Sequence, residues 1–312
     1  MASRKSAHRL QQLSSHFRAD APEAKRATLS SEIKLLLFEG HDDEAAQKAL
    51  SAFLQPPRYK ARPEQLSILE RAETSTFISD GAAITQYVWN PNSNTSLILT
   101  HGFGTCTAFL AQPIQHLLST TPHRIVAIDH AAHGASSGSE TSFGQFILTL
   151  KHLVQRELDE GKHVKALIGH SVGATAMFML YYLHPSVFQK QGSKAAIIAL
   201  NPPLQPTTLM QGFCAQHKLP QDLVVGMRAA FQPSPEDVLK LKIGESGCFR
   251  GVRVLLVQDQ SDKIAVPGET EVLAGLLERG GAVVRVERTS GLGHFKIVSD
   301  GEVLGMVARE CV

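Results

Sequence analysis

A serine with a glycine two positions away on each side stands in the stretch GHSVG at 169–173. An apolar run typical of a buried strand precedes Ser171, and a segment typical of a helix follows it, so the serine is predicted to lie on a sharp strand-to-helix turn. Glycines leave room for such a turn, and the N–H groups that open a helix favour developing negative charge. Ser171 is therefore a candidate nucleophile. The alternative is a small residue at a tight turn, because the pentapeptide occurs by chance in roughly one such chain in ten.

A serine hydroxyl needs a base to take its proton, and histidine is the side chain best suited to that task. Among the 14 histidines, His294 follows the last predicted strand, in the glycine-rich stretch GLGHF. The base in turn needs a carboxylate to fix its tautomer, and the stretch VLLVQDQSDK offers Asp259 and Asp262 directly after a strand. Position alone leaves either aspartate possible. Nucleophile, acid and histidine fall in the chain order of one class of serine hydrolases.

Attack on a carbonyl group also creates negative charge that backbone N–H groups must stabilise. One donor is expected from Val172, the residue after the serine. The second is expected from the glycine-bracketed loop HGFG at 101–104, where the N–H of Phe103 is the preferred donor and that of Gly104 the neighbouring possibility.

These residues follow short apolar runs that alternate with segments long enough for helices. Such runs are typical of parallel strands buried on both faces. They cover residues 95–102, 123–130, 164–171, 194–203, 252–260 and 282–290. Two further segments on either side of Asp80-Gly81 have the pattern of an antiparallel hairpin. The predicted fold is α/β, a doubly wound and mostly parallel sheet entered through that hairpin.

Two helical additions are expected beside the sheet. Apolar residues from Leu29 to Leu54 recur at helical spacing around a break at Gly40, which predicts a helical hairpin within an N-terminal extension of residues 1–68. Residues 69–312 are then the main domain. About fifty residues, 202–250, replace the single crossover helix expected between two strands, and their apolar, proline-broken composition predicts a lid.

From about Thr74 to the C-terminus the chain resembles the α/β-hydrolase family, in its lidded, esterase-like and lipase-like serine branch. The resemblance rests on HGFG at 101–104, DHAAHGASSG at 129–138, GHSVG at 169–173, QSDKIAVP at 260–267 and GHF at 293–295. It implies Ser171 as nucleophile, Asp262 as acid and His294 as base, with the N–H groups of Phe103 and Val172 as oxyanion donors. The chain departs from the family pattern at Asp259 and Ala132, which stand where glycines are usual.

A serine nucleophile argues against dehalogenase and epoxide hydrolase activity, which use aspartate. We expect a small-molecule carboxylic ester with an apolar acyl or alcohol group, and no cofactor. Candidate substrate-binding residues are His170, beside the nucleophile, and Met210 and Phe213 in the lid. The alternatives are a thioesterase or acyltransferase, a cofactor-free haloperoxidase or carbon-carbon hydrolase, and a noncatalytic binding protein on the same fold.

Composition supports a globular chain, with 19% charged residues, 43% hydrophobic residues and a net charge of +2, and it does not indicate a nucleic-acid partner. The four separated cysteines predict neither a zinc site nor a disulfide framework, and His130 and His133 lack a third ligand, so no metal is expected. We expect no transmembrane segment and a cytoplasmic location. The basic residues Arg4, Lys5, Arg9 and Arg18 leave an organelle-targeting N-terminus as the alternative. The sequence does not indicate an oligomeric state.

Overall fold

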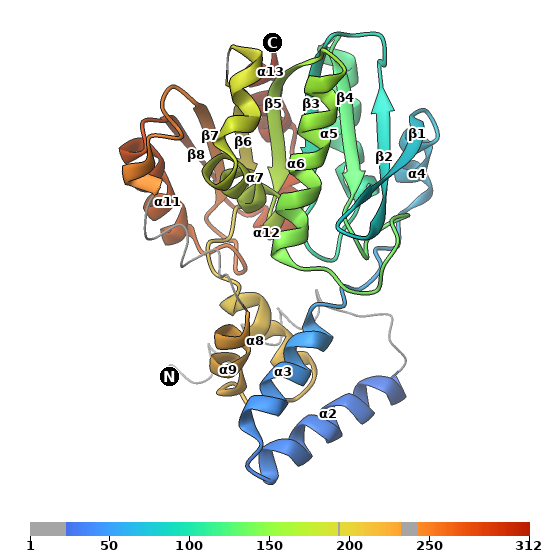
Figure 1. Ribbon diagram of the computed structural model, residues 1–312, viewed down its shortest axis with the longest axis vertical. Helices are drawn as coiled ribbons and strands as arrows, with labels where there is room; N and C mark the ends of the chain where they lie inside the picture. Colours follow the sequence, from blue (N-terminus) through green and yellow to red (C-terminus); the bar gives the residue numbers. More distant parts are fainter. Residues whose placement is uncertain (1–22, 193, 232–242) are drawn as a thin grey trace.

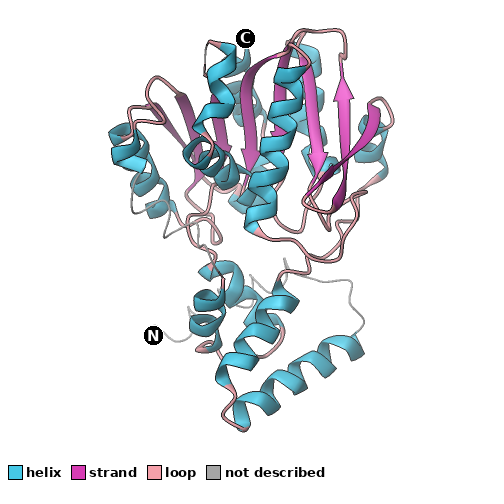
Figure 2. Ribbon diagram, viewed as in Figure 1, coloured by secondary structure: helices cyan, strands magenta, loops and turns pink. Residues whose placement is uncertain are grey.

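The computed structural model describes residues 23–192, 194–231 and 243–312, so the basic N-terminal segment and part of the expected lid lie outside the described residues. A single eight-stranded sheet forms the centre, in the order β1-β2-β4-β3-β5-β6-β7-β8. Strands β1 and β2 pair antiparallel, β2 pairs antiparallel with β4, and all other neighbours are parallel. The predicted mostly parallel sheet with an antiparallel hairpin is therefore confirmed (Figure 2). The strands are β1 Glu73–Ser79, β2 Ala82–Trp89, β3 Thr95–Thr100, β4 Arg124–Asp129, β5 His163–His170, β6 Ala196–Leu200, β7 Arg253–Asp259 and β8 Val283–Thr289.

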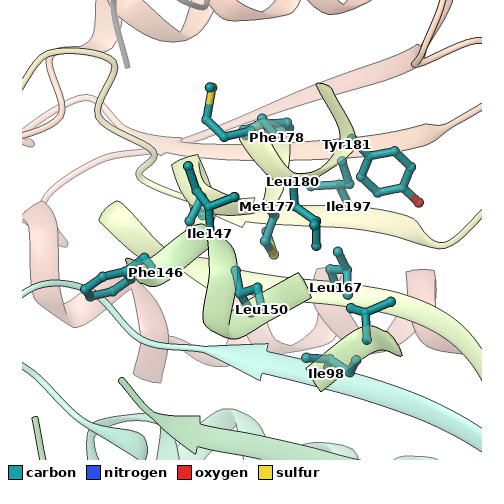
Figure 3. Close-up of a cluster of buried hydrophobic side chains, with 14 of the residues drawn as sticks. Ile98, Phe146, Ile147, Leu150, Leu167, Met177, Phe178, Leu180, Tyr181 and Ile197 are labelled. Carbon is teal, nitrogen blue, oxygen red and sulfur yellow. The ribbon is translucent and has the colours of Figure 1, made fainter. Parts of the chain in front are cut away.

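The central strands are mostly apolar and almost entirely buried, as expected where helices cover both faces of the sheet. One buried cluster joins the sheet to α6, α7 and α11 (Figure 3), and a second joins its other face to α4, α5 and α13. Helix α6 begins at a capping box of Ser142 and Gln145, and Asp300 caps α13. The helices are α4 Pro63–Leu69, α5 Ala111–Thr120, α6 Phe143–Asp159, α7 Val172–Leu183, α11 Pro267–Arg279, α12 Gly293–Lys296 and α13 Gly301–Cys311, with 3-10 turns η1 Thr107–Leu110, η2 Pro185–Gln191 and η3 Ile297–Ser299.

Four helices lie together at one end of the molecule, below the sheet in Figure 1. Two come from the N-terminal segment, α2 Glu23–Phe38 and α3 Asp42–Phe53, and two from the segment between β6 and β7, α8 Thr207–Gln216 and α9 Leu223–Ala230. They share a third buried apolar cluster, which includes Ile33, Ala49, Phe53, Met210 and Met227. We call these four helices the cap. The two added segments, far apart in sequence, thus cover each other's apolar faces.

The cap lies at the end of the sheet where β3, β5, β6 and β7 have their carboxyl ends, because α12 and the loops after those strands face it (Figure 1). Ligands of open parallel sheets bind at this end. Among the described residues, no helix combines the length and the hydrophobicity needed to cross a bilayer.

Candidate active site

Ser171 occupies the turn between β5 and α7 with φ 55° and ψ −131°, a backbone conformation that few residues other than glycine adopt. The glycines around it have no room for a side chain. A Cβ on Gly169 would lie 2.7 Å from Ala174 Cα, and one on Gly173 would lie 2.3 Å from the carbonyl oxygen of His101. Close packing of β5 against α7 and β3 therefore explains both glycines, and the strained turn directs the serine hydroxyl out of the sheet.

A chain of two hydrogen bonds joins Ser171 to His294 and His294 to Asp262. Ser171 Oγ lies 2.8 Å from His294 Nε2, and His294 Nδ1 lies 2.7 Å from Asp262 Oδ2. Because a carboxylate only accepts, Nδ1 carries the proton and donates it, which leaves Nε2 free to accept the serine proton. All three side chains are buried, with Ser171 only 5% exposed. This arrangement can convert a serine hydroxyl into a nucleophile.

Asp262 is held by its own loop. Its Oδ1 accepts hydrogen bonds from the backbone N–H groups of Ile264, at 2.7 Å, and Ala265, at 3.0 Å, while Oδ2 faces His294. Two backbone donors stabilise the ionised carboxylate and fix its orientation. Of the two aspartates that position alone left possible, the structure brings Asp262 to the histidine.

Asp259 instead organises the loop that carries His294. Its carboxylate accepts from the N–H groups of Ser261, Leu292 and Gly293 and from the hydroxyl of Thr289. Burial raises the pKa of this carboxyl, but the hydrogen bonds outweigh burial, and the net pKa is lowered. A carboxylate at the position of the usual family glycine thus connects the acid loop to the histidine loop.

Two more polar side chains fix the backbone at His294. His170 Nε2 donates to the carbonyl oxygen of His294 at 2.7 Å, and Asn201 Nδ2 donates to that of Gly293 at 3.0 Å. Burial, with the neighbouring His294 ring, holds the pKa of His170 well below its usual value, so the His170 ring is neutral. The sequence did not indicate Asn201, since an asparagine after a strand is common in loops.

The loop after β3 lies against the serine. A Cβ added to Gly102 would be 2.8 Å from Ser171 Cβ and 3.3 Å from Ser171 Oγ. The N–H of Gly104 donates to His133 Nε2 at 2.9 Å, so it is already paired. The N–H groups of Phe103 and Val172 donate to no other residue in the described ranges. The geometry therefore leaves the Phe103 amide, rather than that of Gly104, free to bind a ligand oxygen beside Ser171.

Three buried histidines pack beneath this loop. His101 Nδ1 donates to the carbonyl of Gly102, its Nε2 accepts from the N–H of His130, and the rings of His101 and His133 lie 5.0 Å apart. Burial lowers the pKa of His101 and holds those of His130 and His133 well below their usual value, the His101 ring adding to the effect on both. The three rings are thus neutral groups that shape the loop. In this turn Ala132 has φ 64°, a conformation better suited to the glycine usual in the family.

No group of three or more His, Cys, Asp or Glu side chains is placed to hold a metal ion in the described part of the chain. Cys106, near the same loop, is buried, and burial together with the charge of Asp129 raises the pKa of its thiol to about 12. A thiol with such a pKa is a poor nucleophile at neutral pH. The geometry thus gives Cys106 no role beside Ser171.

Two cavities lie between the sheet and the cap. The serine cavity is partly open and has a volume of about 320 Å³. It is lined by Ser171 and His294 together with Pro57, Tyr59, Phe103, Gly104, Thr105, Phe109, His170, Leu209, Ile264 and Phe295. The inner cavity encloses about 50 Å³, and its lining is almost wholly apolar. It is bounded by Phe53, Leu54, Phe103, Thr141, Ser142, Phe143, Phe146, Val172, Thr175, Pro203, Leu204, Gln205, Pro206, Leu209 and Phe231. Phe103 and Leu209 belong to both linings and stand between the two cavities.

The expected substrate-binding residues differ in where the structure places them. His170 lines the serine cavity. Met210 and Phe213 lie in the buried cluster of the cap and line neither of the two cavities, whereas Leu209, on the same helix α8, lines both. Their apolar character was readable from the sequence, but which of the neighbouring apolar residues of α8 faces the cavities was not, because that depends on how the helix packs.

The N-terminal segment also contributes to the site. The Phe53 ring stacks on that of Phe103 with centroids 5.4 Å apart, and Pro57 and Tyr59 line the serine cavity. Arg58 ties the same segment to the main body by donating to the carbonyl oxygens of Gly134, Ser136 and Gly138. The N-terminal extension thus lies against the site and forms part of the walls of its cavities.

Comparisons with known proteins identify the family of the chain and agree with its fold. The model of a family described as the alpha/beta hydrolase family matches residues 97–292. A search of curated proteins finds no match to the chain. Among solved structures, the esterase Pf2001 of Pyrococcus furiosus is similar, with 18% identity and a TM-score of 0.62 over 82% of this chain and 97% of that one.

Two further solved structures are similar over most of their own length. Est1E of Butyrivibrio proteoclasticus, solved with ferulic acid bound, shares 15% identity with a TM-score of 0.53, over 75% of this chain and 95% of that one. The thioesterase domain from the curacin biosynthetic pathway shares 16% identity with a TM-score of 0.53, over 76% of this chain and 98% of that one. At such identities the likeness concerns the fold.

Proposed function

Because the chain belongs to the alpha/beta hydrolase family, we propose that it is a serine hydrolase that cleaves a carboxylic ester through an acyl-enzyme on Ser171. The observation that carries the proposal is the unbroken hydrogen-bond chain from Ser171 Oγ through His294 to Asp262, at 2.8 and 2.7 Å. A strained turn at the serine and two unpaired amides beside it add support, because both are what acyl transfer requires.

In the first half of the reaction, Ser171 Oγ attacks the carbonyl carbon of the ester while His294 Nε2 takes the hydroxyl proton. The carbonyl oxygen becomes negatively charged and accepts from the N–H groups of Phe103 and Val172. When the tetrahedral intermediate collapses, the bond to the leaving oxygen breaks, and the imidazolium returns its proton to that oxygen. Asp262 stabilises the imidazolium meanwhile. The products are an alcohol and an ester of Ser171.

In the second half, water takes the place of the alcohol. His294 Nε2 accepts a proton from the water as its oxygen attacks the acyl carbon, and then donates that proton to Ser171 Oγ as the ester bond breaks. A carboxylic acid leaves and the serine is restored. His170 and Asn201, which bind the backbone of the histidine loop, act as positioning residues in both halves.

The lining of the two cavities favours an oxygen ester as the substrate over a thioester of a charged carrier. Among the described residues that line the two cavities there is no Lys, Arg, Asp or Glu, so no side chain there pairs with a phosphate or carboxylate. Aromatic and aliphatic side chains favour a neutral, apolar alcohol group. The similarity of fold does not distinguish an esterase from a thioesterase, since similar structures include esterases and a thioesterase domain.

We further propose that the cap is a lid, formed by the N-terminal hairpin together with the helices between β6 and β7. Its helices bury their apolar sides against each other, and Phe53 and Leu209 extend from it to the site. The cap thereby shields from bulk solvent a serine that is 5% exposed. A covered site strengthens the electrostatic interactions that stabilise the oxyanion.

Labelling with a fluorophosphonate probe tests the proposal. The wild-type protein should be labelled and should hydrolyse p-nitrophenyl esters, whereas Ser171→Ala should lose both properties, with a fall in kcat of about 10⁴-fold or more. Ser119→Ala, at an exposed serine of α5, is the matched control and should behave as wild type. An unlabelled wild-type protein, under conditions that label a known esterase, would contradict the serine mechanism. Labelling without turnover of oxygen esters would favour acyl transfer to another acceptor.

A further inference from the structure

The inner cavity neighbours the serine cavity, because the side chains of Phe103 and Leu209 line both. It adjoins the turn that carries Ser171, because Val172, the residue after Ser171, is part of its wall, and so is Thr175 one turn further along α7. Its walls are mainly aromatic and aliphatic side chains from the sheet domain and from the cap. An apolar space of this kind beside a nucleophile accommodates an apolar part of a ligand.

The positions of the catalytic groups decide which part of an ester each cavity receives. The leaving oxygen must lie near His294 Nε2, because that nitrogen protonates it. His294 lines the serine cavity and not the inner one, so the alcohol group belongs in the serine cavity. The carbonyl oxygen lies between the N–H groups of Phe103 and Val172, and both of these residues line the inner cavity. Because the serine cavity takes the alcohol group, the inner cavity is the apolar space left for the acyl chain, which would enter it past Phe103 and Leu209.

The two volumes differ strongly. A cavity needs roughly 10–15 Å³ for each water-sized group that it holds. The inner cavity, at about 50 Å³, thus has room for a few carbon atoms beyond the carbonyl, while the serine cavity, at about 320 Å³, can hold a group as large as an aromatic ring system. The expected ester has a short acyl chain, between acetyl and butyryl, and a larger neutral alcohol.

The N-terminal segment forms the outer wall of the inner cavity. Phe53 and Leu54 line it, and the Phe53 ring packs on Phe103 by stacking and on Phe213 edge to face. This wall is fixed to the sheet domain, because the N–H of Thr141 donates to the carbonyl of Leu54 at 2.9 Å and Gln55 Nε2 donates to Glu140 at 3.0 Å. A wall held in this way limits the length of an acyl chain.

We infer that the inner cavity is the acyl subsite and that Phe53 and Leu54, outside the segment matched by the family model, make this enzyme selective for short-chain acyl esters. The inference rests on the proposed function and extends it to a substrate class. Truncation of Phe53 joins its volume to the cavity, so longer acyl chains should then be accepted. Each methylene that newly fits an apolar cavity changes kcat/KM by about 10-fold or more.

The test compares kcat/KM for p-nitrophenyl acetate, butyrate, hexanoate and octanoate. Wild type should prefer acetate or butyrate and should lose about 10-fold or more by octanoate. Phe53→Ala should raise the octanoate-to-acetate ratio by about 10-fold or more, whatever happens to the absolute rates. Phe38→Ala, the same substitution at an 89% exposed side chain of the same hairpin, should leave the ratio unchanged.

Leu54→Phe provides a second variant that narrows the cavity instead of opening it. It should lower the butyrate-to-acetate ratio, and it serves where Phe53→Ala does not fold, as judged by circular dichroism. A wild-type preference for octanoate, or ratios unchanged in both variants, would overturn the inference. These outcomes leave the proposed function intact as long as Ser171 is labelled and esters are hydrolysed. Absence of labelling and hydrolysis would instead refute the proposed function.

Discussion

The backbone N–H of Gly104 donates to His133 Nε2 across 2.9 Å, which joins the loop after β3 to the turn after β4. His133 Nδ1 donates in turn to the carbonyl of Ala131, so the ring acts as donor on one side and acceptor on the other. Only the neutral imidazole can do both, and burial keeps it neutral by holding the pKa of His133 well below its usual value. The loop that presents the Phe103 amide to Ser171 thus depends on an uncharged histidine.

This dependence predicts a loss of stability in mild acid. Burial, with neighbouring imidazoles, holds the pKa values of His130, His133 and His170 well below the usual 6.5. Above pH 6.5 the three rings are neutral in the folded and in the unfolded chain. As the pH falls through 6.5, only the unfolded chain takes up protons on them. Each histidine then removes up to about 1.4 kcal/mol of stability per pH unit. We expect urea unfolding to show several kcal/mol lost between about pH 7.5 and about pH 5.5.

A histidine variant shows whether these rings are the cause. His133→Asn removes one of the three buried histidines, so about one proton fewer should be taken up on unfolding at the acid end of that interval. The stability should then depend less on pH. His41→Asn, at an exposed histidine before α3, should leave the dependence as in wild type. A stability that stays constant down to about pH 5 would mean that the buried rings gain protons in the folded state.

The two aspartates of the loop after β7 should differ in what their substitution does. Asp262→Asn keeps the size of the side chain but no longer requires the proton on His294 Nδ1, so kcat should fall by about 10³-fold to 10⁴-fold while the unfolding midpoint changes little. Asp259→Asn loses the charge that four donors stabilise and should mainly lower stability, by about 1–3 kcal/mol. Kinetics and thermal unfolding of both variants separate the roles. Equal losses of kcat would contradict the assignment of Asp262 as the acid.

Gly102 should tolerate no side chain, although its φ is not in the left-handed region. An added Cβ would meet Ser171 Cβ at 2.8 Å and would displace the serine or the loop beside it, so Gly102→Ala should lower kcat by about 100-fold, since a misplacement of about 1 Å costs that much. Gly268→Ala is the matched control, because a Cβ there would meet nothing within 4 Å. Steady-state kinetics on one short-chain ester measures both. A Gly102→Ala enzyme with wild-type kcat would show that the loop adjusts freely.

Arg58 should hold the N-terminal segment over the site. Its guanidinium donates to three carbonyl oxygens of the turn at residues 134–138, and Arg58→Ala removes all three bonds from an exposed position. We expect a loss of about 1 kcal/mol and faster proteolysis between α3 and α4. Arg62→Ala, whose side chain is 67% exposed beside Glu64, is the control. Equal proteolysis rates in both variants would show that other contacts hold the segment.

Much of the fold could be predicted from the sequence. The sheet strands are read from apolar runs such as those around Leu167 and Leu255, because parallel strands buried on both faces leave few polar positions. The turn at Asp80-Gly81 and the elbow at Ser171 have local signals in their glycines. Helix α4 was not anticipated, since Pro63–Leu69 is too short to show a periodic pattern, yet Ile68 is buried against the sheet domain.

The contacts between elements far apart in the sequence could not be predicted. Asp259 and Asp262 are both carboxylates on one loop, and only the backbone path decides that one meets His294 while the other accepts from Gly293. Leu209 and Met210 are both apolar and adjacent, and only the packing of α8 decides that the first faces the cavities.

The sequence by itself determined the types of the reacting groups, their chain order and the strands that carry them, because each of these depends on residues near in sequence. The tertiary structure decided the partners: which aspartate faces His294, which amide stays free beside Ser171, and which segment closes the site. Apolar periodicity tells that α3 and α8 must be covered, but it does not tell what covers them. Here each covers the other, and Phe53 of the N-terminal segment thereby becomes part of the wall of a cavity beside a serine more than a hundred residues away.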